Sequence, residues 1–534
     1  MNASTSPAAH RSVLADRLQL ALEAPERAAS WHWLYEALER AETLDRHATL
    51  NALVRSRPHQ GMGAMLAATV MDSFAADGSE LAQAAHACCN SALPLDAGLA
   101  LMHTMYARGL RDGGNVAGLA ASLKLSGFVD VARHVGERLR ARGAQRQVGA
   151  APAAAAQRAN SRTAQRGQPA RRVAVVAPTL STGFHAPTQM ALAHACALLE
   201  QGLDVSVFSP QEFLMPRMAD WLGTPRNMAI DLPERSRWPT PAVDSLHVAL
   251  VNLSLSMGGR WVTLLAAIDQ FAPDAVLFIG PYSPLLWPLH ARYPVLGLGT
   301  NAVCPVGPLD LWLAPQPGAT SAWQSELGQP AVQAHTQRLR VDVPRTAASS
   351  ARDDLPRDAV LWLTSGSRLK TELTPVWTAG VMAALEHNPQ VHWLLVGKVD
   401  SLPAQVPRDH PRVHLRSFDK TLDALMLGCD LYLNPPRIGG GFSVAMAMAS
   451  GLPVLSLQGS DGGDKLGPMA SADEAAYLRA LDSLSRDADA RRAAGAAQRA
   501  RFDSVFNLRH AGRGLLAAIN DTVQLAQRRL AAAA

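Results

Sequence analysis

The chain has 534 residues, 48% of them hydrophobic and 18% charged, a balance typical of a soluble globular protein with two or three domains. Its longest apolar stretch, residues 275–289, is interrupted by three prolines, which excludes a transmembrane helix, and the first residues lack the apolar core of a secretory signal. The five cysteines are scattered and odd in number. They indicate neither a disulfide framework nor a zinc site, so a cytoplasmic location is expected.

The formal net charge of +5 comes from one segment of the chain. Residues 142–172 contain seven arginines and no acidic residue. An Ala-, Gln- and Arg-rich segment of this kind is typical of a solvated tether between folded parts. A nucleic-acid partner is therefore not expected, and weak contact of this linker with acidic lipid headgroups is the alternative interpretation.

The first part of the chain shows the 3.6-residue periodicity of helices and little strand signal. Short connections with Gly or Pro separate the segments, and we expect an all-α, repeat-like domain over residues 1–141, although no clean repeat period is present. A linker over residues 142–171 follows. Helices are predicted at residues 12–24, 30–44, 48–56, 61–74, 80–89, 95–110 and 128–142.

After the linker, buried strands alternate with helices over residues 172–345. This alternation predicts a doubly wound parallel sheet, the α/β architecture of Rossmann-like domains. Strands are predicted at residues 171–180, 204–210, 247–255, 275–280, 294–299 and 309–315, with helices at 188–202 and 261–273.

A second α/β domain is predicted over residues 346–534, after a connection near residues 345–357. Its last part consists of long amphipathic helices. Strands are predicted at residues 359–366, 391–397, 413–418, 431–433 and 454–457, and helices at 375–387, 421–428, 442–450, 473–485, 487–502 and 509–530.

Three consecutive glycines precede the helix predicted over residues 442–450. Because they carry no side chains, backbone N–H groups can converge on a ligand there, and together with the helix dipole they form an anion site suited to a diphosphate. A tight turn that only packing requires is the alternative. The candidate nucleotide-binding residues of this segment are Asn434, Gly439, Gly440, Gly441, Phe442 and Ser443.

Two loops that follow strands are further candidates. His185 lies after the first strand of residues 172–345, at the sheet edge where doubly wound folds bind ligands, and a histidine there can move protons near neutral pH. Lys370, with Arg368 as the alternate, follows the first strand of the second domain and can neutralise a diphosphate leaving group. The structural alternatives are a histidine that caps a helix and a surface loop with two cations.

A polar loop is predicted at residues 459–465. Asp461, or alternatively Asp464, is placed there to contact the donor sugar or the acceptor, although such loops are usually only exposed to solvent. A metal-dependent transferase would need an Asp-x-Asp pair at a strand end, and the only such pair, Asp487 and Asp489, lies in a charged helical run. No metal is therefore expected. The sequence also lacks a GxSxG elbow, a P-loop and a dinucleotide-binding fingerprint.

Four segments in this order resemble the O-GlcNAc transferase family of GT-B glycosyltransferases, including its bacterial branch of cytoplasmic adhesin glycosyltransferases. They are FHAPTQM, the stretch from Pro294 to Ala314, SGSRLK, and CDLYLNPPRIGGGFSVAMAMASGLPVLS. The resemblance covers residues 172–465. It implies two Rossmann-like domains that face a cleft behind an all-α domain, with the acceptor on the side of the first and the nucleotide sugar on the side of the second.

The resemblance also implies a reaction. It is metal-independent transfer from a nucleotide sugar, with a UDP-sugar as the donor and a protein side chain, presented by the helical domain, as the acceptor. In this comparison His185 faces the donor, Lys370 stabilises the diphosphate, and the backbone of Ser417 and Phe418 contacts the uracil.

One position departs from the family. Met446 stands where the family has an acidic residue that binds the ribose hydroxyls, and a methionine side chain cannot accept those hydrogen bonds. Loss of a charged acceptor costs about 1.5–3 kcal/mol. Two other interpretations stay open: a retaining GT-B transferase for surface polysaccharides or lipid-linked glycans, and a GT-B scaffold without catalysis. The sugar and the stereochemistry are not determined by the sequence.

Overall fold

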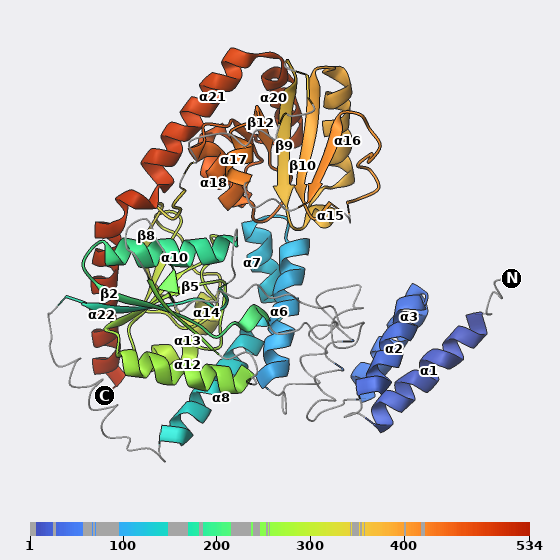
Figure 1. The fold of residues 1–534 in the computed structure, drawn as a ribbon. Coiled ribbons are helices and arrows are strands. Elements are labelled where there is room, and N and C mark those ends of the chain that lie inside the picture. Colours follow the sequence, from blue (N-terminus) through green and yellow to red (C-terminus); the bar gives the residue numbers. More distant parts are fainter. Residues whose placement is uncertain are drawn as a thin grey trace.

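The computed structural model describes residues 7–24, 28–56, 95–147, 169–180, 185–214, 246–251, 257–341, 358–399, 402–417 and 422–533, with a few isolated residues between these ranges. A helical part, two α/β domains and a set of C-terminal helices follow one another along the chain (Figure 1). In the described part of the chain, no helix is long and apolar enough to cross a membrane.

The helical part agrees with the predicted all-α segment and adds one helix to it. Helix α7 was not predicted, because glycines at both ends of its sequence favour a loop. The Asn115 side chain caps it by accepting a hydrogen bond from the N–H of Gly118 at 2.8 Å. The described helices are α1 (Pro7–Glu23), α2 (Ala28–Arg40), α3 (Thr43–Ser56), α6 (Leu95–Asp112), α7 (Val116–Leu125) and α8 (Phe128–Gln147).

Some of the predicted segments cannot be compared with the structure. The helices predicted at residues 61–74 and 80–89 lie almost entirely outside the described residues. Helix α8 continues to Gln147, inside the range predicted as the linker, and residues 148–168 lie outside the described part.

The first α/β domain is built on an eight-stranded sheet in the order β3-β4-β2-β1-β5-β6-β7-β8. Only β3 pairs antiparallel. The strands are β1 (Arg172–Val176), β2 (Asp204–Ser209), β3 (Arg237–Trp238), β4 (Leu246–Leu250), β5 (Ala275–Ile279), β6 (Val295–Leu298), β7 (Leu311–Ala314) and β8 (Ala331–Ala334), with helices α10 (Ala186–Leu199), α12 (Met257–Phe271), α13 (Leu286–His290) and α14 (Gln324–Leu327).

The second α/β domain has a five-stranded, fully parallel sheet in the order β11-β10-β9-β12-β13. Its strands are β9 (Val360–Gly366), β10 (Val391–Gly397), β11 (Val413–Ser417), β12 (Leu431–Leu433) and β13 (Val454–Leu455). Its helices are α15 (Leu369–Glu372), α16 (Pro375–His387), α17 (Leu422–Met426), α18 (Gly441–Ala449), α19 (Asp461–Leu466), α20 (Glu474–Arg486) and α21 (Ala488–Arg501), and α22 (Gly512–Ala533) ends the described chain. Two parallel Rossmann-like sheets confirm the predicted fold class.

Alternate residues of β1 belong to two different hydrophobic cores. Val173 and Val175 pack with α10 and α22, whereas Ala174 and Val176 pack with α12, α13 and the helical part. Successive side chains of a strand point to opposite faces of its sheet, so the sheet is covered on both faces. This explains why β1 is a continuous apolar run in the sequence.

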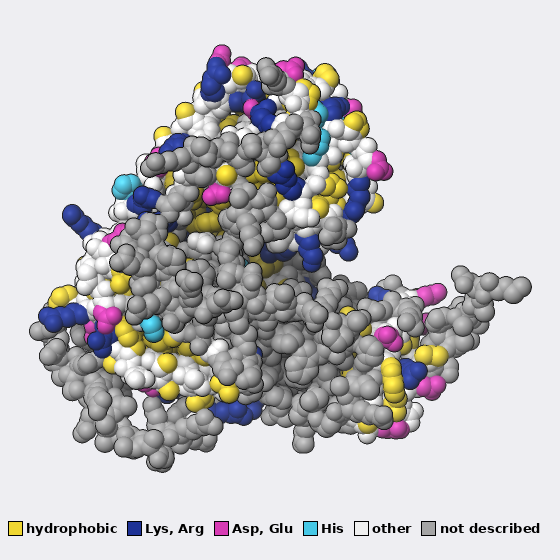
Figure 2. Space-filling view, viewed as in Figure 1, with side chains coloured by type: hydrophobic (Ala, Val, Ile, Leu, Met, Phe, Trp, Pro, Cys, Tyr) yellow, Lys and Arg dark blue, Asp and Glu magenta, His cyan; other side chains and the backbone are white. Residues whose placement is uncertain are grey.

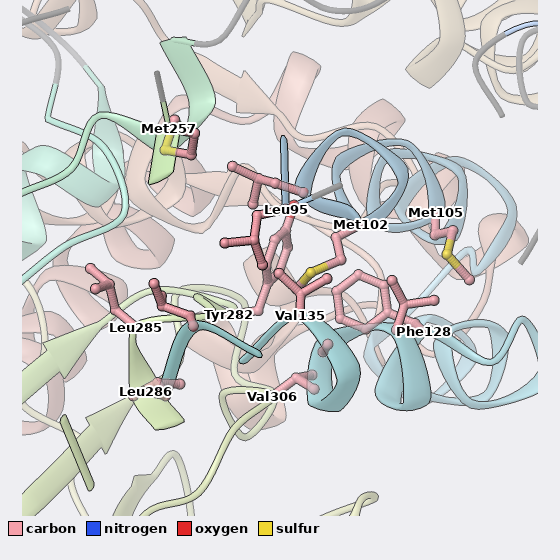
Figure 3. Close-up of a cluster of buried hydrophobic side chains, with 14 of the residues drawn as sticks. Leu95, Met102, Met105, Phe128, Val135, Met257, Tyr282, Leu285, Leu286 and Val306 are labelled. Atoms are coloured by element: carbon pink, nitrogen blue, oxygen red, sulfur yellow. The ribbon is translucent and has the colours of Figure 1, made fainter. Parts of the chain in front are cut away.

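The helical part shares a hydrophobic core with the first α/β domain. Figure 3 shows side chains of α6 and α8, among them Met102 and Phe128, next to Tyr282, Leu286 and Val306 of the α/β domain. All five are buried or nearly so. The helical part is therefore docked on the first α/β domain by apolar contacts.

Helix α8 approaches α13 closely at Gly136. A Cβ atom at Gly136 would lie only 2.2 Å from Cδ2 of Trp287 in α13. Contacts this short do not occur between real side chains, so the indole ring occupies the space that any other residue at position 136 would fill. Glycine is required here by close approach rather than by backbone conformation.

A buried polar group lies in the same interface. One carboxylate oxygen of Glu212 accepts hydrogen bonds from Ser283 Oγ at 2.6 Å and Trp261 Nε1 at 2.8 Å. His103 of α6 hydrogen-bonds with its Nε2 to the backbone carbonyl of Glu212 and with its Nδ1 to the hydroxyl of Tyr282. Burial raises the pKa of Glu212 to about 8, although the hydrogen bonds from Ser283 and Trp261 limit the rise.

The C-terminal helix α22 returns to the first α/β domain. It packs against α10 and the strands β5, β6 and β7, as Figure 1 shows. Arg529 of α22 donates to the Asp310 carboxylate at 2.7 Å, and the Asn520 side chain accepts from the N–H of Ala170 at 2.9 Å. The first domain is therefore completed by a helix that the sequence places with the second.

Candidate functional site

The glycine turn between β12 and α18 has the backbone shape that the sequence suggests. Gly439 and Gly440 have φ angles of 100° and 75°, in the region that side chains disfavour. A Cβ at Gly440 would lie 2.4 Å from Nε of Arg437, and one at Gly441 would lie 2.2 Å from Oδ2 of Asp461. Packing therefore requires glycine at both positions, whatever else the turn does.

The turn leads directly into the N-terminus of α18. The first N–H groups of a helix have no partner within the helix, and the helix dipole adds partial positive charge. The N–H of Gly441 is already used, because it donates to Oδ2 of Asp461 at 3.1 Å. The N–H groups of Phe442 and Ser443, both half-buried, remain as the donors that can meet a phosphate.

A buried arginine, Arg437, connects the glycine turn to the sheet of the second α/β domain. The side chain of Arg437 is only 4% exposed, and it donates to Oε2 of Glu372 at 2.8 Å. It also donates to Oδ1 of Asn434, the carbonyl of Ser365 and the hydroxyl of Tyr432. With this many acceptors, the buried guanidinium is compensated and the turn is fixed to β9 and β12.

Glu372 connects this buried arginine to an exposed one. Its other carboxylate oxygen accepts from Nε of Arg368 at 2.9 Å. Burial by itself would raise the pKa of Glu372, but the charges of Arg437 and Arg368 outweigh it and hold the pKa below its ordinary value. Glu372 is therefore an anion at neutral pH, placed between two guanidinium groups.

Arg368 is the cation that reaches the glycine turn. Its terminal nitrogen donates to the carbonyl of Ile438 at 3.0 Å, and it would lie 3.2 Å from a Cβ at Gly439. Its side chain is still 48% exposed, so the guanidinium is open to a ligand. Lys370 also belongs to α15 but is exposed, and it has no hydrogen bond or ion pair with other described residues. Lys and Arg side chains gather where Figure 1 draws α15 (Figure 2).

Two of the predicted donor-binding residues have other roles in the structure. Asn434 is fully buried, its Oδ1 accepts from Arg437, and its Nδ2 donates to Ser456 Oγ at 3.0 Å. Its amide therefore braces the turn, and its assignment to the nucleotide stays a prediction. The segment around Asp461 was expected to be a polar loop but forms the short helix α19, and Asp461 is 8% exposed.

Helix α19 forms despite two glycines because it is capped and cross-linked. The Ser460 side chain accepts from the N–H of Gly463 at 2.9 Å, and Lys465 donates to Asp461 four residues earlier, also at 2.9 Å. The ammonium group of Lys465 also lies over the ring of Phe506. Asp461 is thus held between a cation and the N-terminus of α18.

His185 is the N-cap residue of helix α10 in the first α/β domain. Its Nδ1 is 2.7 Å from Oγ1 of Thr188, which lies in the first turn of the helix. Burial lowers the pKa of His185 below its ordinary value, so the imidazole is neutral at pH 7. The rest of its loop, residues 181–184, lies outside the described part.

The remaining predicted residues are only partly defined. Ser417 is the exposed last residue of β11, and Phe418 lies outside the described residues. Met446 is 5% exposed and belongs to the core of the second domain. An apolar side chain at this position is therefore explained by packing.

A hydrogen bond between the helical part and the first α/β domain, which the sequence does not mark, lies within the electrostatic reach of Arg368. The hydroxyl of Tyr106 in α6 accepts from Nδ2 of Asn301, in the first α/β domain, at 2.5 Å. Burial raises the pKa of Tyr106, while Asn301 and the charge of Arg368 in the second domain reduce the rise. Arg368 is therefore near Tyr106, and Figure 1 shows α6 and α7 directly below α15. No motif marks Tyr106, and only the packed fold brings these residues together.

The fold was compared with known proteins. No family model matches the sequence, and no curated protein is significantly similar to it. A mutant O-GlcNAc transferase from Thermobaculum terrenum superposes with a TM-score of 0.53 at 15% identity, covering 100% of both chains. The chain has the GT-B fold. This agrees with the resemblance drawn from the sequence.

Two further solved structures match a smaller part of this GT-B chain. WaaG, a glycosyltransferase involved in lipopolysaccharide biosynthesis, covers 65% of this chain and 99% of its own, with 12% identity and a TM-score of 0.40. A trehalose-6-phosphate structure from E. coli with UDP-2-fluoro glucose bound covers 66% and 99%, with 11% identity and a TM-score of 0.43. The O-GlcNAc transferase thus matches a larger share of this chain than either of them.

Proposed function

We propose that this chain is a glycosyltransferase that moves a sugar from a nucleoside diphosphate sugar to an acceptor. The observation that carries the proposal is the full-length match to an O-GlcNAc transferase, which includes the helical part as well as both α/β domains. The glycine turn supports it independently, because a helix N-terminus with an adjacent half-exposed guanidinium suits a diphosphate.

Stabilisation of the leaving diphosphate is the main task of the proposed site. The N–H groups of Phe442 and Ser443 and the guanidinium of Arg368 are fixed donors, so they need little reorganisation when charge develops on the phosphate. The guanidinium of Arg368 can form bidentate hydrogen bonds with a phosphate, whereas the ammonium group of Lys370 adds a point charge from the exposed side of α15. The proposal involves no metal ion.

His185 is the proposed acid–base group. When Nδ1 donates to Thr188, Nε2 carries the lone pair and can take a proton from an acceptor hydroxyl. The lowered pKa of His185 keeps it in this neutral form at pH 7.

The donor is proposed to be a UDP-sugar and the acceptor a protein side chain. In this proposal the backbone at Ser417 and Phe418 contacts the base, and the helical part presents the acceptor. The position of Tyr106 supports a role for the helical part, because its hydroxyl is hydrogen-bonded to Asn301 and lies near Arg368.

Titration calorimetry with UDP, GDP and their sugar conjugates tests the proposal. We expect one UDP-sugar to bind in the micromolar range, and Arg368→Ala to weaken it by about tenfold to a hundredfold, as for loss of a charged hydrogen-bond partner. Arg412→Ala is the matched control, because Arg412 directly precedes β11, at the opposite end of the parallel strands from the glycine turn, and bonds the C-terminus of α16.

The outcomes separate three interpretations. Binding that Arg368→Ala weakens, together with sugar release, supports the transferase. Binding of a nucleotide sugar without release of the sugar, whichever acceptor is added, supports the non-catalytic scaffold. Absence of binding by every nucleotide and nucleotide sugar would overturn the proposal.

A further inference from the structure

We propose that Asp461 is an internal anion that occupies part of the diphosphate position and must give up that position when the donor binds. The inference deepens the proposed function and rests on it. It concerns how tightly the site holds a nucleoside diphosphate, which the overall fold does not determine.

The carboxylate of Asp461 lies at the N-terminus of α18. Oδ2 of Asp461 accepts the N–H of Gly441 at 3.1 Å, and it is so close that a Cβ on Gly441 would lie 2.2 Å away. Gly441 is the first residue of α18, so this N–H points out of the helix N-terminus, where a phosphate oxygen would accept. The carboxylate makes the same kind of contact as a bound phosphate.

Asp461 is held in place by the residues around it. Its other oxygen, Oδ1, accepts from Lys465 at 2.9 Å, and both side chains are about nine-tenths buried. Burial lowers the pKa of Arg338, a buried residue of the first α/β domain, and the negative charge of Asp461 opposes part of this lowering. A carboxylate with these partners is ordered before any ligand arrives.

Charged side chains of both signs lie around the glycine turn. Arg368, Arg437 and Lys465 bring three positive charges, and Glu372 and Asp461 bring two negative ones. The carboxylate of Glu372 is bonded to the two arginines, whereas that of Asp461 accepts the N–H of Gly441 at the helix N-terminus. Asp461 is therefore the anion that a diphosphate would meet directly.

The chemical consequence is competition at one N–H group. A diphosphate and the Asp461 carboxylate cannot both approach Gly441 closely, because like charges at contact distance repel in a partly buried site. The donor therefore binds to Phe442, Ser443 and Arg368 while Asp461 turns toward Lys465, or it binds weakly. Asp461 in this way lowers the affinity for free diphosphate.

The test compares Asp461→Asn with the unchanged protein. Asparagine has the same shape and can still accept from Gly441, but it has no charge. We expect the affinity for inorganic pyrophosphate and for UDP, measured by calorimetry, to rise about tenfold, the effect of removing one close repulsive charge. Lys465→Met is the opposing variant, and it should lower the affinity several-fold because Asp461 loses the cation to which it turns.

Asp473→Asn is the matched control. Asp473 also caps a helix, with its side chain accepting from the N–H of Ala476 at 2.7 Å, but that helix is α20, away from the glycine turn. It should leave pyrophosphate affinity unchanged. Thermal unfolding of all variants shows whether each is folded at the temperature of the titration.

The outcomes distinguish this inference from the proposed function. Tighter pyrophosphate binding by Asp461→Asn alone supports the inference. Equal or weaker binding than in the unchanged protein, with UDP still bound, overturns the inference and leaves the transferase proposal intact. If pyrophosphate and UDP bind to neither protein, both the inference and the donor site are overturned.

Discussion

The carboxylate of Glu372 forms ion pairs with both arginines at the glycine turn. It lies between two guanidinium groups and forms an ion pair with each. One pair holds the half-exposed Arg368 at the glycine turn, and the other compensates the buried positive charge of Arg437. Without Glu372, the buried guanidinium would keep only neutral partners. The glycine turn therefore depends on a residue some seventy positions earlier in the chain.

Glu372→Gln is predicted to destabilise the protein. The substitution leaves the buried charge of Arg437 without its counter-ion, and breaking a buried pair in this way costs about 3–5 kcal/mol. Urea unfolding followed by tryptophan fluorescence measures the loss in free energy of unfolding.

Glu386→Gln is the control for this prediction. The Glu386 side chain is 60% exposed and pairs with Arg412 and His410 at the surface, so its removal should cost less than about 1 kcal/mol. Equal losses for the two variants would contradict the role given to Glu372.

The raised pKa of Glu212 is expected to make the stability of the protein depend on pH. This pKa is raised to about 8 by burial, from an ordinary value of 4.5. Between these values the folded protein holds a proton that the unfolded chain has released, so stability falls as pH rises, by at most about 1.4 kcal/mol per pH unit, and levels off above the folded pKa. Glu212→Gln should remove this slope, because an amide does not titrate.

Thermal unfolding midpoints between about pH 5 and 9 test this prediction. The informative quantity is the difference between the variant and the unchanged protein, because the buried histidines His194 and His335 titrate in both. The variant should gain stability relative to the unchanged protein as pH rises through the window. A parallel pair of curves would show that Glu212 is ionised in the folded protein at neutral pH.

At the scale of residues, the site could be predicted only where local sequence determines it. Three glycines before a helix are visible in the sequence, and the structure forms the turn there. The pairing of Arg368 with Glu372, four residues later, was not predicted, because no helix was expected at these residues. The roles of Asn434 and Asp461 were not predicted either, because each depends on a partner that only the folded chain brings close: Arg437 for the first and Gly441 for the second.

At the scale of elements, the close packing of α8 on α13 leads to a prediction about Gly136. Gly136→Ala would place a methyl group 2.2 Å from the ring of Trp287, so one of the two helices must shift, at a cost of about 1–3 kcal/mol. The measurement is the thermal midpoint, together with the near-ultraviolet circular dichroism of the buried tryptophan.

Gly514→Ala is the matched control for Gly136→Ala. Gly514 also lies in a helix, α22, but a Cβ there would meet nothing within 4 Å. Alanine should stabilise this position by about 0.5–1 kcal/mol, because it restricts the unfolded chain. If both alanine variants were stabilised, the close contact of α8 with Trp287 would be wrong.

The elements that sequence reasoning found and missed differ in how they are buried. The apolar runs at β1, β5 and β9 are almost fully buried, and a buried strand can be identified from composition alone. Strand β8 is a partly exposed edge strand of four residues without an apolar run. Helix α19 contains two glycines, and its cap and its Asp461–Lys465 pair are side-chain interactions that composition does not reveal.

At the scale of the whole molecule, the order of domains was predictable but their joining was not. Alternation of strands and helices indicates two α/β domains after a helical part. That the helical part shares a core with the first sheet follows from side chains such as Met102 and Phe128, whose periodicity is the same on any amphipathic helix. The sequence therefore does not distinguish a helical part that is joined to the first α/β domain only through the chain from one that packs against it.

The return of α22 to the first α/β domain has a consequence for synthesis of the chain. The face of the first sheet that carries α10 stays partly uncovered until α22 leaves the ribosome, after the whole second domain has been made. At roughly 5–20 residues per second, this wait is on the order of 10 to 40 s. During that time a nascent chain exposes apolar surface that chaperones recognise, so its yield in cells depends on protection early in translation.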